Sequence, residues 1–224
     1  MSNSLTGSSC GMSYITNSGT ATIENLIIDH NDTPNNLSHT VAGIINDGQG
    51  QMTLKNADID LGRKTNYGIY MLGGKLALSD SAINTTGTTN YGAYIKDGEL
   101  TLQNSTISAT GTTSYGAYIS NGDLVMGEPE PVDSPNYGTE NANVSTTSPS
   151  IKAIGTTSGI GVYKDLGKFK FYDGIITAST SAIPRDNITT DVEHLYEPTF
   201  HTDAYGNDVC ILTWMRDLPS QPGN

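Results

Sequence analysis

The sequence predicts an all-β fold, a single-stranded right-handed parallel β-helix (β-solenoid) of about six coils of 24 residues with three short strands per coil. The first observation is a phrase repeated every 24 residues: Tyr67-Gly-Ile-Tyr70, Tyr91-Gly-Ala-Tyr94 and Tyr115-Gly-Ala-Tyr118 (91 − 67 and 115 − 91). The second is strict apolar–polar alternation inside each repeat. The third is the placement of Gly, Asn or Asp between the alternating segments, where a strand would have to turn.

A second repeated phrase extends this period along most of the chain. It consists of a glycine followed by apolar residues two and four positions later, and its anchors are Gly19, Gly50, Gly74, Gly98, Gly122 and Gly167. The intervals between anchors are 31, 24, 24, 24 and 45 residues, so the first and last exceed the period. We therefore expect a β-helix over residues 19–180, with insertions near 30–40 and 127–150.

Alternation assigns the two faces of each strand. Leu100 and Leu102 share one face, while Glu99, Thr101 and Gln103 share the other. Such strands cannot bury their apolar faces alone, but coils stacked about 4.8 Å apart would enclose a narrow core. An amphipathic helix and a leucine-rich repeat fit this spacing poorly.

A polar column stands six residues after the anchors. It contains Asn25, Asn56, Asp80, Asn104 and Asp173. A metal-binding ladder is one interpretation, but Asn and Asp also satisfy backbone groups at tight corners and bond to one another along a stack. We predict the structural role, with no metal or other cofactor.

The ends of the array require caps, because terminal coils expose unpaired backbone. Residues 1–18 are predicted to form an N-terminal partial coil, and residues 181–224 a C-terminal cap and tail. In the cap, two strands at 194–202 and 208–214 are expected to form a hairpin that packs Trp214 on the last coil. Cys10 and Cys210 lie near opposite ends of the chain, so free thiols are expected rather than a disulfide.

The charge of the chain limits the kinds of partner that it is expected to bind. The net charge of −12 and the pI near 4.5 disfavour binding to nucleic acid or to anionic lipid. Neither a transmembrane segment nor a signal peptide is recognisable.

The repeated phrases, together with Gly167-Lys-Phe-Lys-Phe-Tyr-Asp-Gly-Ile-Ile176, resemble those of adhesin-like β-helical (pectate-lyase-like) surface proteins of gut and other Gram-positive bacteria. The resemblance covers roughly residues 19–180. It implies a secreted or cell-surface location and a non-catalytic role in adhesion, or as a spacer. Surface glycans or host proteins would be the partners, with end-to-end or lateral self-association left open.

The candidate binding residues are four tyrosines that each stand four positions before an anchor glycine: Tyr70, Tyr94, Tyr118 and Tyr163. Because their strand neighbours are apolar, we expect these tyrosines to face outward in a stacked strip that could bind sugar rings or a protein. Stacked surface aromatics can equally serve only to stabilise a sheet. Tyr67, Tyr91 and Tyr115 are expected to face inward and to fill a corner.

Other functions remain as alternatives. Polysaccharide lyases and hydrolases use the same architecture, but they need paired acids, or Ca²⁺ ligands with a basic residue, and no such constellation recurs on one face. Threonine runs such as 85–89 suggest ice binding, yet a glycine interrupts each run at an apparent turn. The acidic insertion at 127–150 is a second candidate site, since long loops on rigid scaffolds often carry binding.

Overall fold

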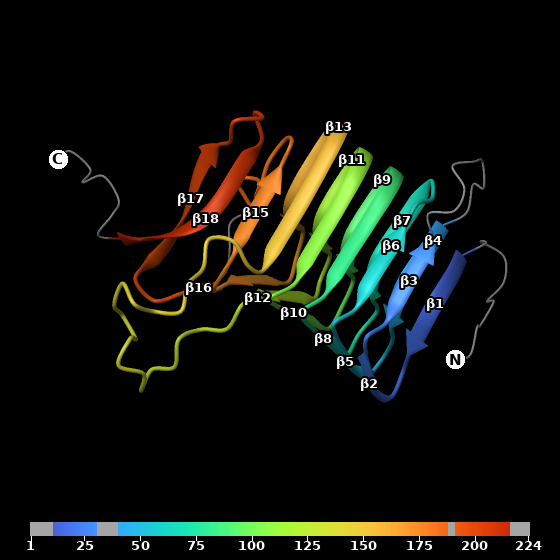
Figure 1. Ribbon diagram of the computed structural model, residues 1–224, viewed down its shortest axis with the longest axis horizontal. Coiled ribbons are helices and arrows are strands. Elements are labelled where there is room, and N and C mark those ends of the chain that lie inside the picture. The colour runs from blue at the N-terminus through green and yellow to red at the C-terminus, as the bar shows by residue number, and fades with distance from the viewer. Residues whose placement is uncertain (1–10, 31–39, 188–190, 216–224) are drawn as a thin grey trace.

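The computed structural model describes residues 11–30, 40–187 and 191–215. Within these ranges the protein is all-β, with strands in two largely parallel sheets and no helix (Figure 1). The larger sheet has the order β1-β4-β7-β9-β11-β13-β15-β18-β17, with β3 and β6 beside this path. Its strands are β1 (Gly11–Asn17), β3 (Ile27–His30), β4 (Thr40–Asn46), β6 (Asp58–Leu61), β7 (Thr65–Met71), β9 (Ala82–Ile95), β11 (Thr106–Ile119), β13 (Ser150–Lys164), β15 (Ile175–Ala178), β17 (Tyr196–Thr202) and β18 (Asp208–Trp214).

The smaller sheet has the order β16-β14-β12-β10-β8-β5-β2. Its strands are β2 (Thr20–Glu24), β5 (Gln51–Lys55), β8 (Lys75–Ser79), β10 (Glu99–Gln103), β12 (Asp123–Met126), β14 (Lys168–Phe171) and β16 (Asp191–Val192). Neighbouring strands pair one sequence period apart: Leu100 lies beside Leu76 on one side and Leu124 on the other. The predicted repeat is therefore the hydrogen-bonding register of the sheets. Hereafter, a rung is the set of residues from one period.

The predicted alternation is confirmed by burial. Leu76, Leu78, Leu100 and Leu102 are at most 1% exposed, whereas the residues between them reach the surface. The core changes character toward the C-terminal end, where Phe169 replaces leucine in this column and is fully buried together with Phe171.

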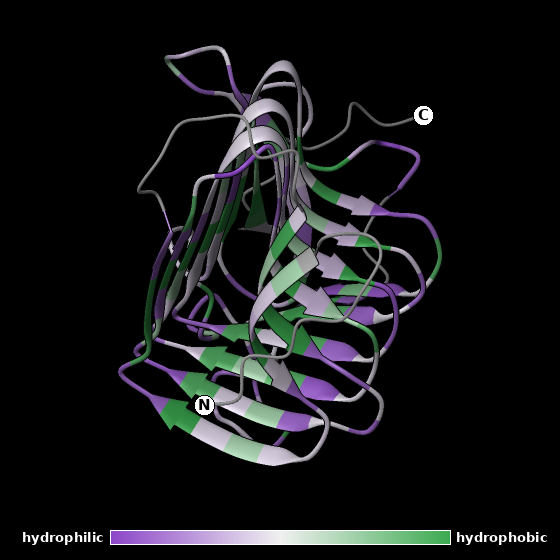
Figure 2. Cartoon of the chain, turned by 90° about the vertical axis from the view of Figure 1, so that its right-hand side faces the viewer, coloured by the Kyte–Doolittle hydropathy of each residue, from purple (hydrophilic) through white to green (hydrophobic). Residues whose placement is uncertain are grey.

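The prediction of three short strands in every coil is wrong for the central rungs. The strands β9, β11 and β13 run for 14, 14 and 15 residues, each joining two of the expected segments. Figure 2 shows these strands arching over the top of the molecule. The threonine runs lie at this arch, and rung-to-rung pairing continues through it, as between Gly87 and Gly111. A Cβ on Gly111 would lie 1.8 Å from the carbonyl oxygen of Gly87, so the arch requires glycine there.

The polar corner column has the predicted structural role. Asn25, Asn56, Asp80 and Asn104 adopt left-handed backbone conformations with φ between 45° and 56°. The side-chain nitrogen of Asn56 donates to Asn25 Oδ1 at 2.6 Å, and that of Asn104 donates to Asp80 Oδ1 at the same distance. Asp173 departs from the column, because there the positive φ falls on the next residue, Gly174.

A buried asparagine ladder runs through the interior, and the sequence patterns did not predict it. Asn66 and Asn90 are both fully buried, and Asn66 Nδ2 donates to Asn90 Oδ1 at 2.8 Å. Asn66 Nδ2 also bonds the carbonyl of Thr86, and Asn90 Nδ2 bonds that of Thr110, one rung further on. These amides fix the axial register of neighbouring rungs from inside, since a slip would leave buried polar groups unpaired.

The predicted C-terminal hairpin is confirmed. The strands β17 and β18 pair antiparallel, and β18 also pairs antiparallel with β15, at the end of the sheet opposite β1 (Figure 1). Trp214 is partly buried against the core.

Cys210 is fully buried, and burial raises the pKa of its thiol to about 12. Cys10, the insertion at 31–39 and the tail from residue 216 lie outside the described residues.

The insertion at 127–150 packs against this cap rather than projecting freely. The backbone nitrogen of Glu130 donates to the buried carboxylate of Glu193 at 2.8 Å. The ring of Tyr137 stacks on that of His194, with 4.8 Å between centroids. These contacts give the insertion a structural role in covering the last rungs.

A candidate tyrosine binding face

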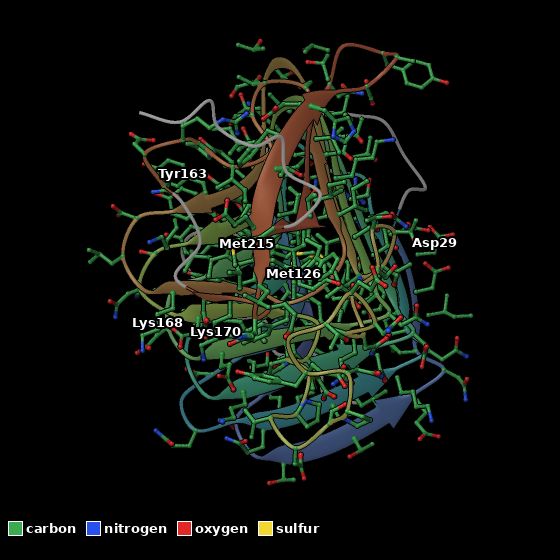
Figure 3. The ribbon with its side chains drawn as sticks, turned by 90° about the vertical axis from the view of Figure 1, so that its left-hand side faces the viewer. Asp29, Met126, Tyr163, Lys168, Lys170 and Met215 are labelled. Carbon is green, nitrogen blue, oxygen red and sulfur yellow. The ribbon has the colours of Figure 1, made fainter. Side chains whose placement is uncertain are left out.

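Seven tyrosines form two adjacent columns on the outer surface of the larger sheet. We call this surface the tyrosine face: column one holds Tyr67, Tyr91 and Tyr115, and column two holds Tyr70, Tyr94, Tyr118 and Tyr163. Tyr163 projects from the same side of the molecule as Lys168 and Lys170, away from Asp29 (Figure 3). The strip predicted from column two is present, with each member half-buried.

The prediction that column one faces inward is wrong. Within β9, Tyr91 is half-buried at the surface, Gly92 and Ala93 are both buried, and Tyr94 returns to the surface. Two consecutive inward residues break the alternation, so tyrosines three positions apart share one face. A Cβ on Gly92 would lie 2.2 Å from Ile107 Cγ2 and 2.6 Å from the carbonyl oxygen of Gly116, so only glycine fits.

The tyrosine rings contact one another along each column. In column one, Tyr67 and Tyr91 are 4.9 Å apart between centroids with an interplanar angle of 5°. In column two, Tyr94 and Tyr118 are 5.1 Å apart with an angle of 6°. Contacting atoms lie about 3.5–4.0 Å apart. Parallel rings at these centroid distances must therefore be offset, and part of each ring face stays uncovered.

The two columns also contact each other. Tyr91 and Tyr94 are 5.4 Å apart at 86°, and Tyr115 and Tyr118 are 5.4 Å apart at 80°. Edge-to-face packing of this kind is a preferred aromatic geometry. Because the ring planes of the two columns are nearly perpendicular in these two rungs, the surface combines rings of two orientations with their hydroxyl groups.

Burial raises the pKa of several phenols of the tyrosine face. The pKa of Tyr67 is raised above its ordinary value of 10 by burial first and then by the neighbouring Tyr70 and Tyr94 hydroxyls. Burial likewise raises the pKa of Tyr91, with neighbouring phenols adding to the effect. For Tyr118 burial is again the first cause, followed by the carboxylate of Asp165. The hydroxyls of Tyr67, Tyr91 and Tyr118 therefore act as uncharged donors and acceptors at neutral pH.

A column of smaller hydroxyls borders the tyrosine face. It lies on the same face, two residues before column one, and consists of Thr65, Thr89, Thr113 and Ser158. On the opposite border the chain turns at corners such as Lys96 and Asp97, both exposed. The face ends toward β1 at Ala42 and Ile45, which occupy the tyrosine positions of β4. In β13, Ile160 takes the column-one position.

Two other groups of polar side chains in the described residues contain three or four members each. On the smaller sheet, Lys75 pairs with Glu99 at 3.1 Å, and Lys170 lies 3.9 Å from both Glu99 and Asp123. These partly exposed pairs contribute little stability. His30 is bonded on its two ring nitrogens by Tyr14 and Arg63.

Neither a metal centre nor a membrane span is found in the part of the chain that the structure describes. No group of three or more His, Cys, Asp or Glu there is arranged to hold a metal ion. A shallow hollow of about 420 Å³ lies over the corner column, lined partly by Asp58 and Asp80. No helix within those ranges is long and apolar enough to cross a membrane.

The comparisons with known proteins return nothing significant. No protein-family model, no curated protein and no solved structure matches this chain. The tyrosine face is therefore interpreted from its own geometry.

Proposed function

We propose that this chain is a non-catalytic recognition module of an extracellular or cell-surface protein, and that it binds its ligand through the tyrosine face. The observation that carries the proposal is the side-by-side placement of two tyrosine columns and one hydroxyl column on a single sheet surface. Aromatic side chains with a polar tip are enriched at binding surfaces, because they offer contact area at low entropic cost.

The proposed scaffold is a right-handed parallel β-helix of the adhesin-like kind. Support comes from the register of one period between neighbouring parallel strands, and from the alternation of successive strands from β7 to β16 between the two sheets. Right-handed connections between parallel strands of one sheet are strongly preferred. A stack of this kind grows by adding rungs, and so offers the same side chains at regular intervals along one surface.

A binding role explains the tyrosines better than sheet stability alone. Column two could stabilise neighbouring strands in any outward position. Column one, however, is not required by the fold, because Gly43 and Gly161 interrupt their strands in the same way beside Ala42 and Ile160. The three central rungs nevertheless bring a second ring to the surface, at a position that β4 fills with alanine and β13 with isoleucine. A purely architectural spacer is the second candidate, since every ring also contacts its neighbours.

The first test is an array of glycans and host surface proteins, probed with wild-type protein and with a variant that replaces Tyr70, Tyr94, Tyr118 and Tyr163 by Ser. Two controls accompany it: the same four residues changed to Phe, which keeps the rings, and Tyr205→Ser in the β17–β18 turn, where the side chain is 91% exposed. We expect saturable binding that the Ser variant loses and the Tyr205 control retains. Circular dichroism verifies that each variant folds.

Two results would contradict this function. Equal binding by wild type and the Ser variant would move the site elsewhere, first to the insertion at 127–150. Absence of binding by the wild type and by every variant would favour the spacer. Reducing-end release measured in the same samples tests the alternative of a polysaccharide-cleaving enzyme.

A further inference from the structure

We infer that the ligand of the tyrosine face is an uncharged polysaccharide in an extended conformation, lying across the strands with about one sugar ring for each rung. This inference rests on the proposed function and specifies its ligand. A globular protein partner is the competing ligand class, and the experiments below separate the two.

The first argument is repetition. In three successive rungs the outward residues are the same, a threonine followed by two tyrosines, as in Thr89, Tyr91 and Tyr94. The fourth keeps a hydroxyl and one tyrosine, with Ser158 and Tyr163. Along the columns the rings recur every 4.9–5.4 Å. A ligand that matches such a surface repeats at the same interval, and the rise of one pyranose along an extended β-linked chain is close to it.

The second argument is charge. Between the hydroxyl column and the corners, the outward side chains of these four rungs are Tyr, Thr, Ser and Ile, with no Asp, Glu, Lys, Arg or His among them. At the corners, Lys96 is followed by Asp97 and Lys164 by Asp165, so the border carries both signs equally. Binding of an anionic polymer would need a cluster of cations on the face. The net charge of −12 also opposes such a polymer.

The third argument is chemical complementarity. A pyranose ring presents axial C–H groups on its faces and hydroxyls around its edge. The partly uncovered tyrosine rings suit the C–H faces, while the phenols and the bordering threonines can exchange hydrogen bonds with the hydroxyls. Sites that bind small molecules combine apolar surface with a few placed polar groups in the same way. Here that combination is repeated once for each rung.

The test is a length series of neutral β-linked oligosaccharides, from disaccharide to octasaccharide, in cello-, laminari- and chito- forms, measured by calorimetry. Polygalacturonate oligomers of matched length serve as the charged comparison. We expect affinity for at least one neutral series to rise with length and to level off once the four tyrosine-bearing rungs of column two are covered. Added salt is expected to leave this binding unchanged.

Rung variants sharpen the test. The double variant Tyr91→Ser, Tyr94→Ser removes both aromatic rings of one rung. The double variant Tyr115→Ser, Tyr118→Ser removes both rings of the next rung. Each pair is expected to weaken binding of the longest oligomer about 2- to 10-fold, to a similar degree, while a disaccharide is affected little. The corresponding Phe pairs retain the stacking contribution and separate it from that of the hydroxyls.

Several outcomes would overturn the inference. Tyrosine-dependent binding to polygalacturonate or to a host protein, without binding to any neutral series, would keep the proposed function but assign the wrong ligand class. A disaccharide that binds as tightly as the octasaccharide would rule out the extended chain. Loss of tyrosine-dependent binding to every probe would refute the proposed function itself.

Discussion

Replacing Gly92 by alanine tests how the tyrosine face is built. Gly92 lies between Tyr91 and Tyr94, and a side chain at this position would point toward the core. If Tyr91 faced inward, as strict alternation predicts, Gly92 would face the solvent and alanine would be harmless. In the structure, the added methyl group meets two neighbours of the same interior, so the outcome separates the two arrangements.

The expected cost follows from the contacts. The new Cβ would lie 2.2 Å from Ile107 Cγ2 and 2.6 Å from the carbonyl oxygen of Gly116. Ile107 is fully buried, and Gly116 belongs to the next rung, so neither neighbour can move without disturbing the stack. Overpacking of this kind costs about 1–3 kcal/mol, and two such contacts place Gly92→Ala near 3 kcal/mol.

The assay is urea denaturation followed by circular dichroism, with hydrogen exchange to locate the change. A loss of about 3 kcal/mol lowers the denaturation midpoint by about 1 M when the slope is about 3 kcal/mol per molar. The matched control is Gly19→Ala, because a Cβ at Gly19 has no neighbour within 4 Å and its backbone is not left-handed. The control is expected to change stability by less than about 1 kcal/mol. Equal stability of the two variants would refute the outward placement of column one.

Three further predictions concern the interior. Ser114→Asn is expected to stabilise the fold by about 1 kcal/mol, because the Ser114 hydroxyl is buried without a partner and lies beside Asn90 in the register, where a third amide would extend the ladder. Ser114→Ala is the control in urea denaturation, since alanine supplies no amide. Burial raises the pKa of Asp173 to about 6, so the folded state holds the extra proton between about pH 4 and 6 and stability falls as pH rises through that window. Because the group is half-exposed, wild type should lose about 1–2 kcal/mol there relative to Asp173→Asn, and a constant difference across the window would contradict this. In a Cys10→Ser background, the buried Cys210 thiol, with its pKa raised to about 12 by burial, is expected to resist a thiol reagent at pH 8 until the protein is denatured; rapid labelling of the native protein would show that the cap is open.

The sheet register could be predicted from the sequence because it depends on a single quantity. Parallel strands one period apart place like residues together, so the spacing of Leu76, Leu100 and Leu124 determines their pairing directly. The corner column was predictable for a similar reason, since Asn and Asp tolerate the left-handed backbone better than other non-glycine residues do. Both predictions use properties of single residues repeated at a fixed interval.

The orientation of column one could not be predicted, because alternation assumes an unbroken pleat. One interruption at Gly68, Gly92 or Gly116 reverses the face of every residue on its N-terminal side. The error about Tyr91 and the failure to see the interior role of Asn90 are therefore the same error. Placing Tyr91 outward puts Asn90 inside. The strand count failed for a different reason: threonine and glycine together resemble a turn, although ladder hydrogen bonds can continue through an arch.

The interior ladder and the tyrosine face depend on each other. Asn66 and Asn90 lie directly before Tyr67 and Tyr91, so the buried amide bond between rungs holds the adjacent rings at a constant interval. A polysaccharide with a regular repeat would bind more tightly to evenly spaced rings, because a surface that is already ordered loses little free energy to rearrangement on binding. Exchange of Asn90 for Ala should therefore weaken the binding of a long oligosaccharide more than that of a disaccharide, although Asn90 never reaches the surface. An equal effect on both would show that the ladder supports the fold alone.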